Sequence, residues 1–205
     1  PEIQRICDRH GILLVSDEVI TGFGRTGQWF GCETMGSRPD LMTFAKGVTS
    51  GYLPLGGVMV GERVARVLIE HGGEFNHGYT YSGHPVCAAV ALENLRIMQE
   101  ENIVAHVQNV AAPALKEALD KLGEHPLVGG VNVSGLMASL PLTPHKESRA
   151  KFADSGTAGY ICRERCFANN LGMRHVGDRM IISPPLVLPP DHFATLIARA
   201  TMALG

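Results

Sequence analysis

Two short apolar segments, each followed by a charged residue, constrain the fold of this chain more than any other feature. The first covers residues 12–15 and leads into Asp17, and the second covers residues 41–45 and ends at Lys46. Apolar or β-branched segments of this length are typical of buried strands in a parallel sheet. Because ligands bind at the carboxyl ends of strands in open α/β sheets, the two charged side chains predict a binding site at that edge.

A carboxylate and a lysine at one sheet edge suit a particular chemistry. A lysine can hold an aldehyde cofactor as a Schiff base while a carboxylate keeps the ring nitrogen of that cofactor protonated. Taken singly, an aspartate at a strand end is usually a turn residue and a lysine is usually solvated. Together, at the ends of two neighbouring strands, Asp17 and Lys46 suggest a site for such a cofactor, and they are the candidate catalytic residues.

The composition and net charge of the chain exclude several classes of function. The chain has 205 residues and a net charge of −2, so it lacks the basic surface that predicts binding to nucleic acid, and a small-molecule partner is expected. No stretch approaches the roughly 18 apolar residues of a membrane span and no signal pattern is present, so we expect a cytoplasmic protein without membrane contact. The five cysteines lack paired spacing and the nine histidines form no cluster, so we expect reduced thiols and no metal site.

A glycine-rich segment at residues 22–27 spells GxGxxG, the pattern of a dinucleotide-binding turn. That turn must close a strand directly and open a helix, whereas here five residues separate the pattern from the strand predicted over residues 12–16. We therefore expect a glycine-rich loop at the active site and no dinucleotide site.

The hydrophobic periodicity predicts two domains of an α/β protein. Residues 1–102 alternate helices and strands, which is typical of a large domain built on a mainly parallel sheet. Residues 103–205 open with a long amphipathic run and continue as short strands and helices, which is typical of a smaller α+β domain.

A polar and aromatic loop precedes a strong helix that opens at Pro85. Proline is favoured in the first helical turn, and Ser82 is placed to cap the helix. The free N–H groups at a helix start attract anions, so the same end, next to Thr80, suits a phosphate.

Three separated motifs carry a recognisable pattern. They are SDEVITGFGRTG over residues 16–27, PDLMTFAKG over residues 39–47 and NHGYTYSGHP over residues 76–85. In this order they resemble the class III pyridoxal-phosphate aminotransferases, and residues 169–185 resemble the family's ω-amino acid and amine:pyruvate branch. The resemblance extends over essentially the whole chain. It implies a fold-type I transferase, with the carboxyl-terminal part of the large domain followed by the small carboxyl-terminal domain.

The resemblance implies roles for residues around the cofactor, which would be pyridoxal 5′-phosphate. Asp17 would pair with the pyridinium nitrogen and keep the ring cationic, so that the ring withdraws electrons from the substrate carbon. Val19 would lie against the ring face. Lys46 would form the Schiff base and then carry the proton between the substrate carbon and the cofactor.

The resemblance also implies residues that bind phosphate and substrate. Thr80, with the backbone at Tyr79, would hold the phosphate of the cofactor in a neighbouring subunit, which implies a homodimer or a dimer of dimers with shared active sites. Arg174 would grip the carboxylate of pyruvate or of an ω-amino acid, using a planar geometry that lysine lacks. Trp29 would form a wall of the substrate pocket.

The implied activity is transfer of an amino group from a primary amine or ω-amino acid, such as a putrescine-like diamine or β-alanine, to pyruvate. An aminomutase of the same fold remains an alternative because it uses the same aspartate and lysine, although Arg174 favours the transferase. A third possibility is a catalytically incomplete fragment. The chain opens at Pro1 with helical periodicity and no initiating methionine, so we expect a carboxyl-terminal fragment. The family's phosphate loop and the aromatic residue that stacks on the cofactor would lie in the missing half.

Overall fold

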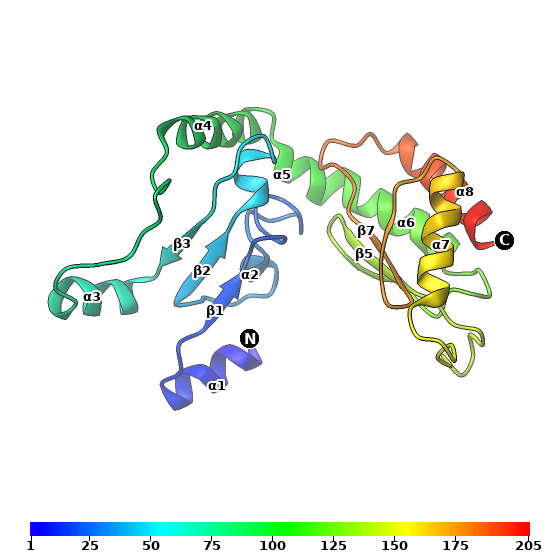
Figure 1. Cartoon of the computed structure of the whole chain (residues 1–205), viewed down its shortest axis with the longest axis horizontal. Coiled ribbons are helices and arrows are strands. Elements are labelled where there is room, and N and C mark those ends of the chain that lie inside the picture. Colours follow the sequence, from blue (N-terminus) through cyan, green and yellow to red (C-terminus); the bar gives the residue numbers. More distant parts are fainter. The chain divides into compact units, whose positions relative to one another are not determined.

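The computed structural model describes residues 1–205, which form two compact units, Pro1–Val104 and Ala105–Gly205. Each unit carries its own sheet (Figure 1). None of the helices combines the length and the apolar character needed to cross a bilayer.

The first unit alternates helices and strands, as the sequence predicted. Its elements are α1 (Glu2–His10), β1 (Val15–Asp17), α2 (Gly31–Thr34), β2 (Leu41–Phe44), the 3₁₀ turn η1 (Lys46–Thr49), β3 (Gly57–Val60), α3 (Glu62–His71) and α4 (Pro85–Glu100), with α5 (Ile103–His106) crossing into the second unit. Helix α1 ends at Gly11, whose left-handed φ of 66° permits the chain to turn directly towards β1.

The sheet of the first unit has the order β1-β2-β3. Strands β1 and β2 are parallel, and β3 runs antiparallel to β2. The prediction that the two strands are buried is wrong for this chain, because apolar side chains on the sheet are exposed, with Val15 at 52%. A parallel sheet is buried only when other layers cover both of its faces, and this chain supplies little such cover. One contact that it does supply is Phe23, whose ring packs against Phe44 of β2 at 6.0 Å between centroids.

The start of α4 differs from the prediction in one detail. Pro85 is the first helical residue, as expected, but His84 occupies the cap position and no side chain caps the helix. Ser82 is not the cap. Its Oγ instead accepts a hydrogen bond from the N–H of Tyr79 at 2.9 Å, because the turn before the helix folds back on itself.

The second unit is a four-stranded antiparallel sheet packed with helices. After the π-helical turn η2 (Val107–Ala111), its elements are α6 (Ala112–Leu122), β4 (Asn132–Ser134), β5 (Met137–Pro141), α7 (Thr157–Ala168), β6 (Arg174–Val176), β7 (Arg179–Ile182) and α8 (Asp191–Leu204). The strand order is β4-β5-β7-β6, with every neighbouring pair antiparallel.

One hydrophobic core holds the second unit together. Leu115 and Leu119 of α6 are fully buried, and Phe193 of α8 is nearly so. They share a cluster with Leu140 of β5 and Met180 of β7. Burying one such side chain contributes about 1.5–3 kcal/mol, so this core fixes the position of the hairpin formed by β6 and β7.

Candidate functional site

Asp17 lies at the carboxyl end of β1, opposite Thr43 of β2 in the parallel ladder. Its Oδ1 accepts hydrogen bonds from the hydroxyl of Thr43 at 3.0 Å and from the N–H of Val19 at 3.1 Å. The side chain is exposed, and Val19 is half-buried. Both hydrogen bonds use the same oxygen, so the carboxylate is held in one orientation while Oδ2 faces no donor of this chain.

Lys46 follows β2 and begins η1 with a left-handed φ of 44°, which non-glycine residues rarely adopt. The amine is exposed and makes no ion pair. Lys46 lines an open hollow of about 710 Å³. The other lining residues are Ala45, Thr49, Gly51, Leu53, Pro54, Leu55 and Gly56.

The structure brings Asp17 and Lys46 to the same end of two neighbouring strands. Because β1 and β2 are parallel and Asp17 pairs with Thr43, Lys46 lies three residues past the position opposite Asp17. This arrangement was predicted from the sequence. It places an acid of fixed orientation and an unpaired amine at the edge of the sheet where ligands bind.

Glu18, next to Asp17, was not identified from the sequence. Its side chain is 1% exposed and accepts hydrogen bonds from the hydroxyls of Ser16 and Thr21 and from the N–H groups of Gly31 and Cys32. Burial raises the pKa of Glu18, but the four hydrogen bonds outweigh it and hold the pKa below its usual value. The carboxylate thus ties the end of β1 to the start of α2. The neighbouring hydroxyl residues were the only signal of this role in the sequence.

The loop between β1 and α2 contains the GxGxxG pattern and packs beside Lys46. Phe23 is 4% exposed, and its ring contacts Phe30 at 5.4 Å between centroids. A Cβ placed on Gly47 would lie 2.9 Å from the Cβ of Phe23, so only glycine fits beside Lys46. The short helix α2 begins at Gly31, after the pattern has ended, so the geometry is not that of a dinucleotide-binding turn.

Three further residues predicted for the site, Trp29, Tyr79 and Thr80, lie in connecting segments of the first unit. Trp29 is half-buried in the loop, where its carbonyl accepts a hydrogen bond from the N–H of Phe23 at 2.6 Å. Tyr79 and Thr80 lie in the connection between α3 and α4, and Tyr79 is 79% exposed. No hydrogen bond joins either of them to Asp17 or Lys46 within the chain.

Arg174 belongs to the second unit, where it is the first residue of β6 and pairs with Ile181 of β7. Its side chain is exposed and makes no ion pair. The turn after β6 is anchored by Asp178, whose carboxylate accepts hydrogen bonds from the N–H of Gly156 at 2.9 Å and of Gly159 at 3.1 Å. Asp178 therefore serves the N-terminus of α7 and fixes the hairpin that presents Arg174. No group of three or more His, Cys, Asp or Glu side chains is arranged to hold a metal ion.

Comparison with known families agrees with this geometry. The model of the family "Aminotransferase class-III" matches residues 1–203. The chain belongs to the class III aminotransferases. The resemblance seen in the three sequence motifs is thereby confirmed.

Individual relatives are similar over the whole of this chain. It is 52% identical to the putrescine–pyruvate aminotransferase of Pseudomonas aeruginosa, covering 100% of this chain and 44% of that protein. It is 36% identical to a probable mitochondrial γ-aminobutyrate transaminase of Oryza sativa subsp. indica, covering 99% of this chain and 40% of that protein. The crystal structure of the omega transaminase from Pseudomonas jessenii in complex with PMP superimposes with a TM-score of 0.93 and 36% identity, over 99% of this chain and 45% of that one.

The chain thus spans less than half the length of the relatives it matches. The match confirms the α/β, fold-type I architecture expected from the sequence. Pyridoxal 5′-phosphate is the cofactor of this family. The residues described above fit it, since Asp17 offers a free carboxylate oxygen and Lys46 an unpaired amine beside an open hollow.

Proposed function

We propose that the protein containing this chain transfers an amino group from a primary amine or ω-amino acid to pyruvate, with pyridoxal 5′-phosphate as its cofactor. The observation that carries the proposal is the placement of Asp17 and Lys46 at the ends of adjacent parallel strands in a class III aminotransferase chain. A carboxylate and a lysine are the two groups on which this cofactor depends.

Asp17 is the residue that holds the ring nitrogen in its protonated form. The cofactor would supply an aldehyde carbon that bonds to the Lys46 amine or to the substrate amine in turn, and a cationic ring that withdraws electrons from the substrate carbon. Hydrogen bonds from Thr43 and Val19 to Oδ1 orient the carboxylate. Oδ2 would then be available to accept a hydrogen bond from the ring N–H. Val19 would lie against one face of the ring.

Lys46 has two tasks. Its Nζ would bond to the aldehyde carbon of the cofactor before the substrate arrives and, once released, would carry the proton from the substrate carbon to the cofactor. An amine can do this only if it is free to move and is not locked in an ion pair. Lys46 meets that requirement, because it is exposed, has no carboxylate partner and lines the hollow.

Arg174 is the residue that binds the carboxylate of pyruvate or of an ω-amino acid. A guanidinium grips a carboxylate through two parallel hydrogen bonds, and that of Arg174 has no ion-pair partner in this chain. Trp29 forms a wall of the substrate pocket. The 52% identity to a putrescine–pyruvate aminotransferase supports a putrescine-like diamine as donor, and the 36% identity to a γ-aminobutyrate transaminase supports an ω-amino acid such as β-alanine.

We further propose a cytoplasmic homodimer, or a dimer of dimers, with shared active sites. Thr80 and the backbone at Tyr79 hold the phosphate of the cofactor in the neighbouring subunit. Tyr79 is exposed, and neither Tyr79 nor Thr80 forms a hydrogen bond with Lys46. Both observations support a role for these residues in the active site of the neighbouring subunit. In domain terms, residues 1–102 form the carboxyl-terminal part of the large cofactor-binding domain and residues 103–205 the small domain.

The test is a panel of amine donors with pyruvate as acceptor, using the full-length protein that contains this chain. We expect alanine to form, and Lys46→Ala to abolish both turnover and the absorbance of the bound cofactor. Lys116→Ala is the matched control, because Lys116 is an exposed lysine that pairs with Asp120 on α6. Unchanged absorbance and turnover in Lys46→Ala would contradict the proposal. A half-reaction that released an isomerised amino acid and no keto product would identify an aminomutase.

A further inference from the structure

A residue of α4 reaches back to the turn that follows Lys46. Asn94 is half-buried, and its Nδ2 donates hydrogen bonds to the carbonyl oxygens of Gly47 at 3.0 Å and of Val48 at 3.1 Å. These carbonyls belong to η1, more than forty positions earlier in the sequence. Asn94 therefore links α4 to the two residues that directly follow Lys46.

The turn needs such an external support. It begins with Lys46 at a φ of 44° and is followed by Ser50 at a φ of 51°, both in the left-handed region. Strained backbone of this kind persists only where the surroundings hold it. The Gly47 carbonyl also accepts a hydrogen bond from the N–H of Ser50 at 3.1 Å. The Val48 carbonyl has no backbone donor, so the Asn94 amide supplies its hydrogen bond.

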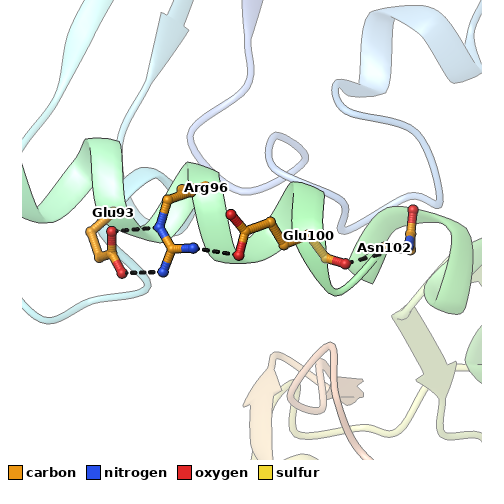
Figure 2. Close-up of polar contacts among 4 residues, drawn as sticks. All are labelled: Glu93, Arg96, Glu100 and Asn102. Carbon is orange, nitrogen blue, oxygen red and sulfur yellow. Dashed lines mark hydrogen bonds and ion pairs between the residues drawn. The ribbon is translucent and has the colours of Figure 1, made fainter.

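The chemistry at residue 94 requires an amide. A primary amide carries two N–H donors on one nitrogen, which matches two adjacent carbonyl oxygens. An aspartate of the same shape would place oxygen atoms against those carbonyls and repel them. The other polar residues of this part of α4 behave differently, since Arg96 forms ion pairs with Glu93 and Glu100 on the exposed surface of the helix (Figure 2).

We infer that Asn94 is a positioning residue for Lys46, holding η1 so that the lysine amine is directed to the aldehyde of the cofactor. The inference rests on the role proposed above for Lys46. It predicts an effect on the bond between lysine and cofactor that is separate from binding of the cofactor by the rest of the site.

Two forms of the cofactor separate these effects. Pyridoxal phosphate forms a covalent bond with the lysine, whereas pyridoxamine phosphate occupies the same site without one. We would measure the dissociation constants of both with the full-length protein, comparing the wild type with Asn94→Asp and Asn94→Ala. Glu93→Gln is the matched control, because it exchanges a carboxylate for an amide one position away on the exposed surface. Borohydride reduction followed by mass spectrometry of the Lys46 peptide would report the covalent bond directly.

We expect the dissociation constant for pyridoxal phosphate to rise about tenfold in Asn94→Asp and Asn94→Ala, the effect of losing two partly buried hydrogen bonds. The constant for pyridoxamine phosphate should not change, and Glu93→Gln should match the wild type with both ligands. If Asn94→Asp does not fold, Asn94→Ala carries the comparison.

Equal loss of both ligands, no change in either, or failure of both variants to fold would overturn the inference, because Asn94 would then support only the fold or nothing. If the reduced wild type carried no label on Lys46, the proposed function itself would fail. That outcome is distinct from a labelled wild type with unaffected variants.

Discussion

Gly159 of α7 lies so close to Gly177 that a Cβ at residue 159 would come within 2.1 Å of the Gly177 carbonyl oxygen. A glycine inside a helix normally lowers stability, so alanine would ordinarily be an improvement. Here the missing side chain is what permits α7 to contact the turn between β6 and β7. This contact, with the hydrogen bonds of Asp178, fixes the hairpin that carries Arg174.

Gly159→Ala is therefore expected to destabilise the protein by about 1–3 kcal/mol through overpacking. This loss is larger than the stability gained from the higher helix propensity of alanine. Gly172→Ala is the control, because a Cβ there meets no atom within 4 Å and the φ of Gly172 is not left-handed. That variant should be neutral or slightly more stable. Thermal unfolding of both variants checks the prediction, and equal melting temperatures would contradict it.

Asp178→Asn should weaken the same hairpin in a different way. An amide has one acceptor oxygen where the carboxylate has two, so one of the N–H groups of Gly156 and Gly159 loses its partner, at a cost of about 1–2 kcal/mol. If Arg174 binds the acceptor, the KM for pyruvate should rise more than the KM for a diamine donor, which has no carboxylate. Asp154→Asn, at an exposed position shortly before α7, is the control and should change neither. Equal changes in both KM values would show that Asp178 has no specific effect on binding of the acceptor.

The environment of Glu18 predicts how the stability of the protein depends on pH. Its pKa is lowered in the folded protein from an ordinary value of 4.5, so its contribution to stability is complete above that value and is lost as the pH falls through the lower folded pKa. In Glu18→Gln this acid-dependent loss should disappear. The variant should also lose about 3 kcal/mol at neutral pH, because the amide nitrogen faces N–H and O–H donors.

Denaturant unfolding of the wild type and of Glu18→Gln between acid and neutral pH tests this. Glu33→Gln is a suitable control, since the exposed Glu33 accepts a hydrogen bond from the Phe30 N–H that glutamine can also accept. Parallel pH profiles for the wild type and Glu18→Gln would show that other carboxylates control the acid response.

Gly47→Ala is expected to reduce cofactor binding, because its Cβ would press on Phe23 and displace the backbone next to Lys46. Coupling with Phe23→Gly, which removes the Cβ that the new methyl group would meet, identifies the cause. If the clash with Phe23 is responsible, Gly47→Ala should cost less in the Phe23→Gly background than in the wild type, a difference that a double-mutant cycle on melting temperature and cofactor affinity measures. Additive effects would show that the loss of cofactor binding does not arise from contact with Phe23.

The sequence was sufficient to predict the positions of Asp17 and Lys46, because each ends a short apolar segment and such segments form parallel strands. It was not sufficient to predict Glu18. A glutamate beside a strand end is usually solvated, and its burial depends on N–H groups of Gly31 and Cys32 that only folding brings near.

Two further differences have the same origin. Ser82 is a good cap by residue type, but the turn of the preceding loop directs its hydroxyl to Tyr79 instead. Asn94 carried no signal in the sequence, because its partners are backbone carbonyls more than forty residues away. Local patterns predict which strands and helices form, whereas hydrogen bonds between distant segments follow from the tertiary structure.

Strand β3 has a consequence for handling the 205-residue polypeptide on its own. It lies at an edge of its sheet and exposes Val58, Met59 and Val60 in succession. An uncovered, apolar strand edge is a template on which other chains can add strands. We expect concentration-dependent light scattering from this polypeptide and suppression of that scattering by Met59→Lys. Self-association through strand addition, and not a failure to fold, would then limit the solubility of this polypeptide.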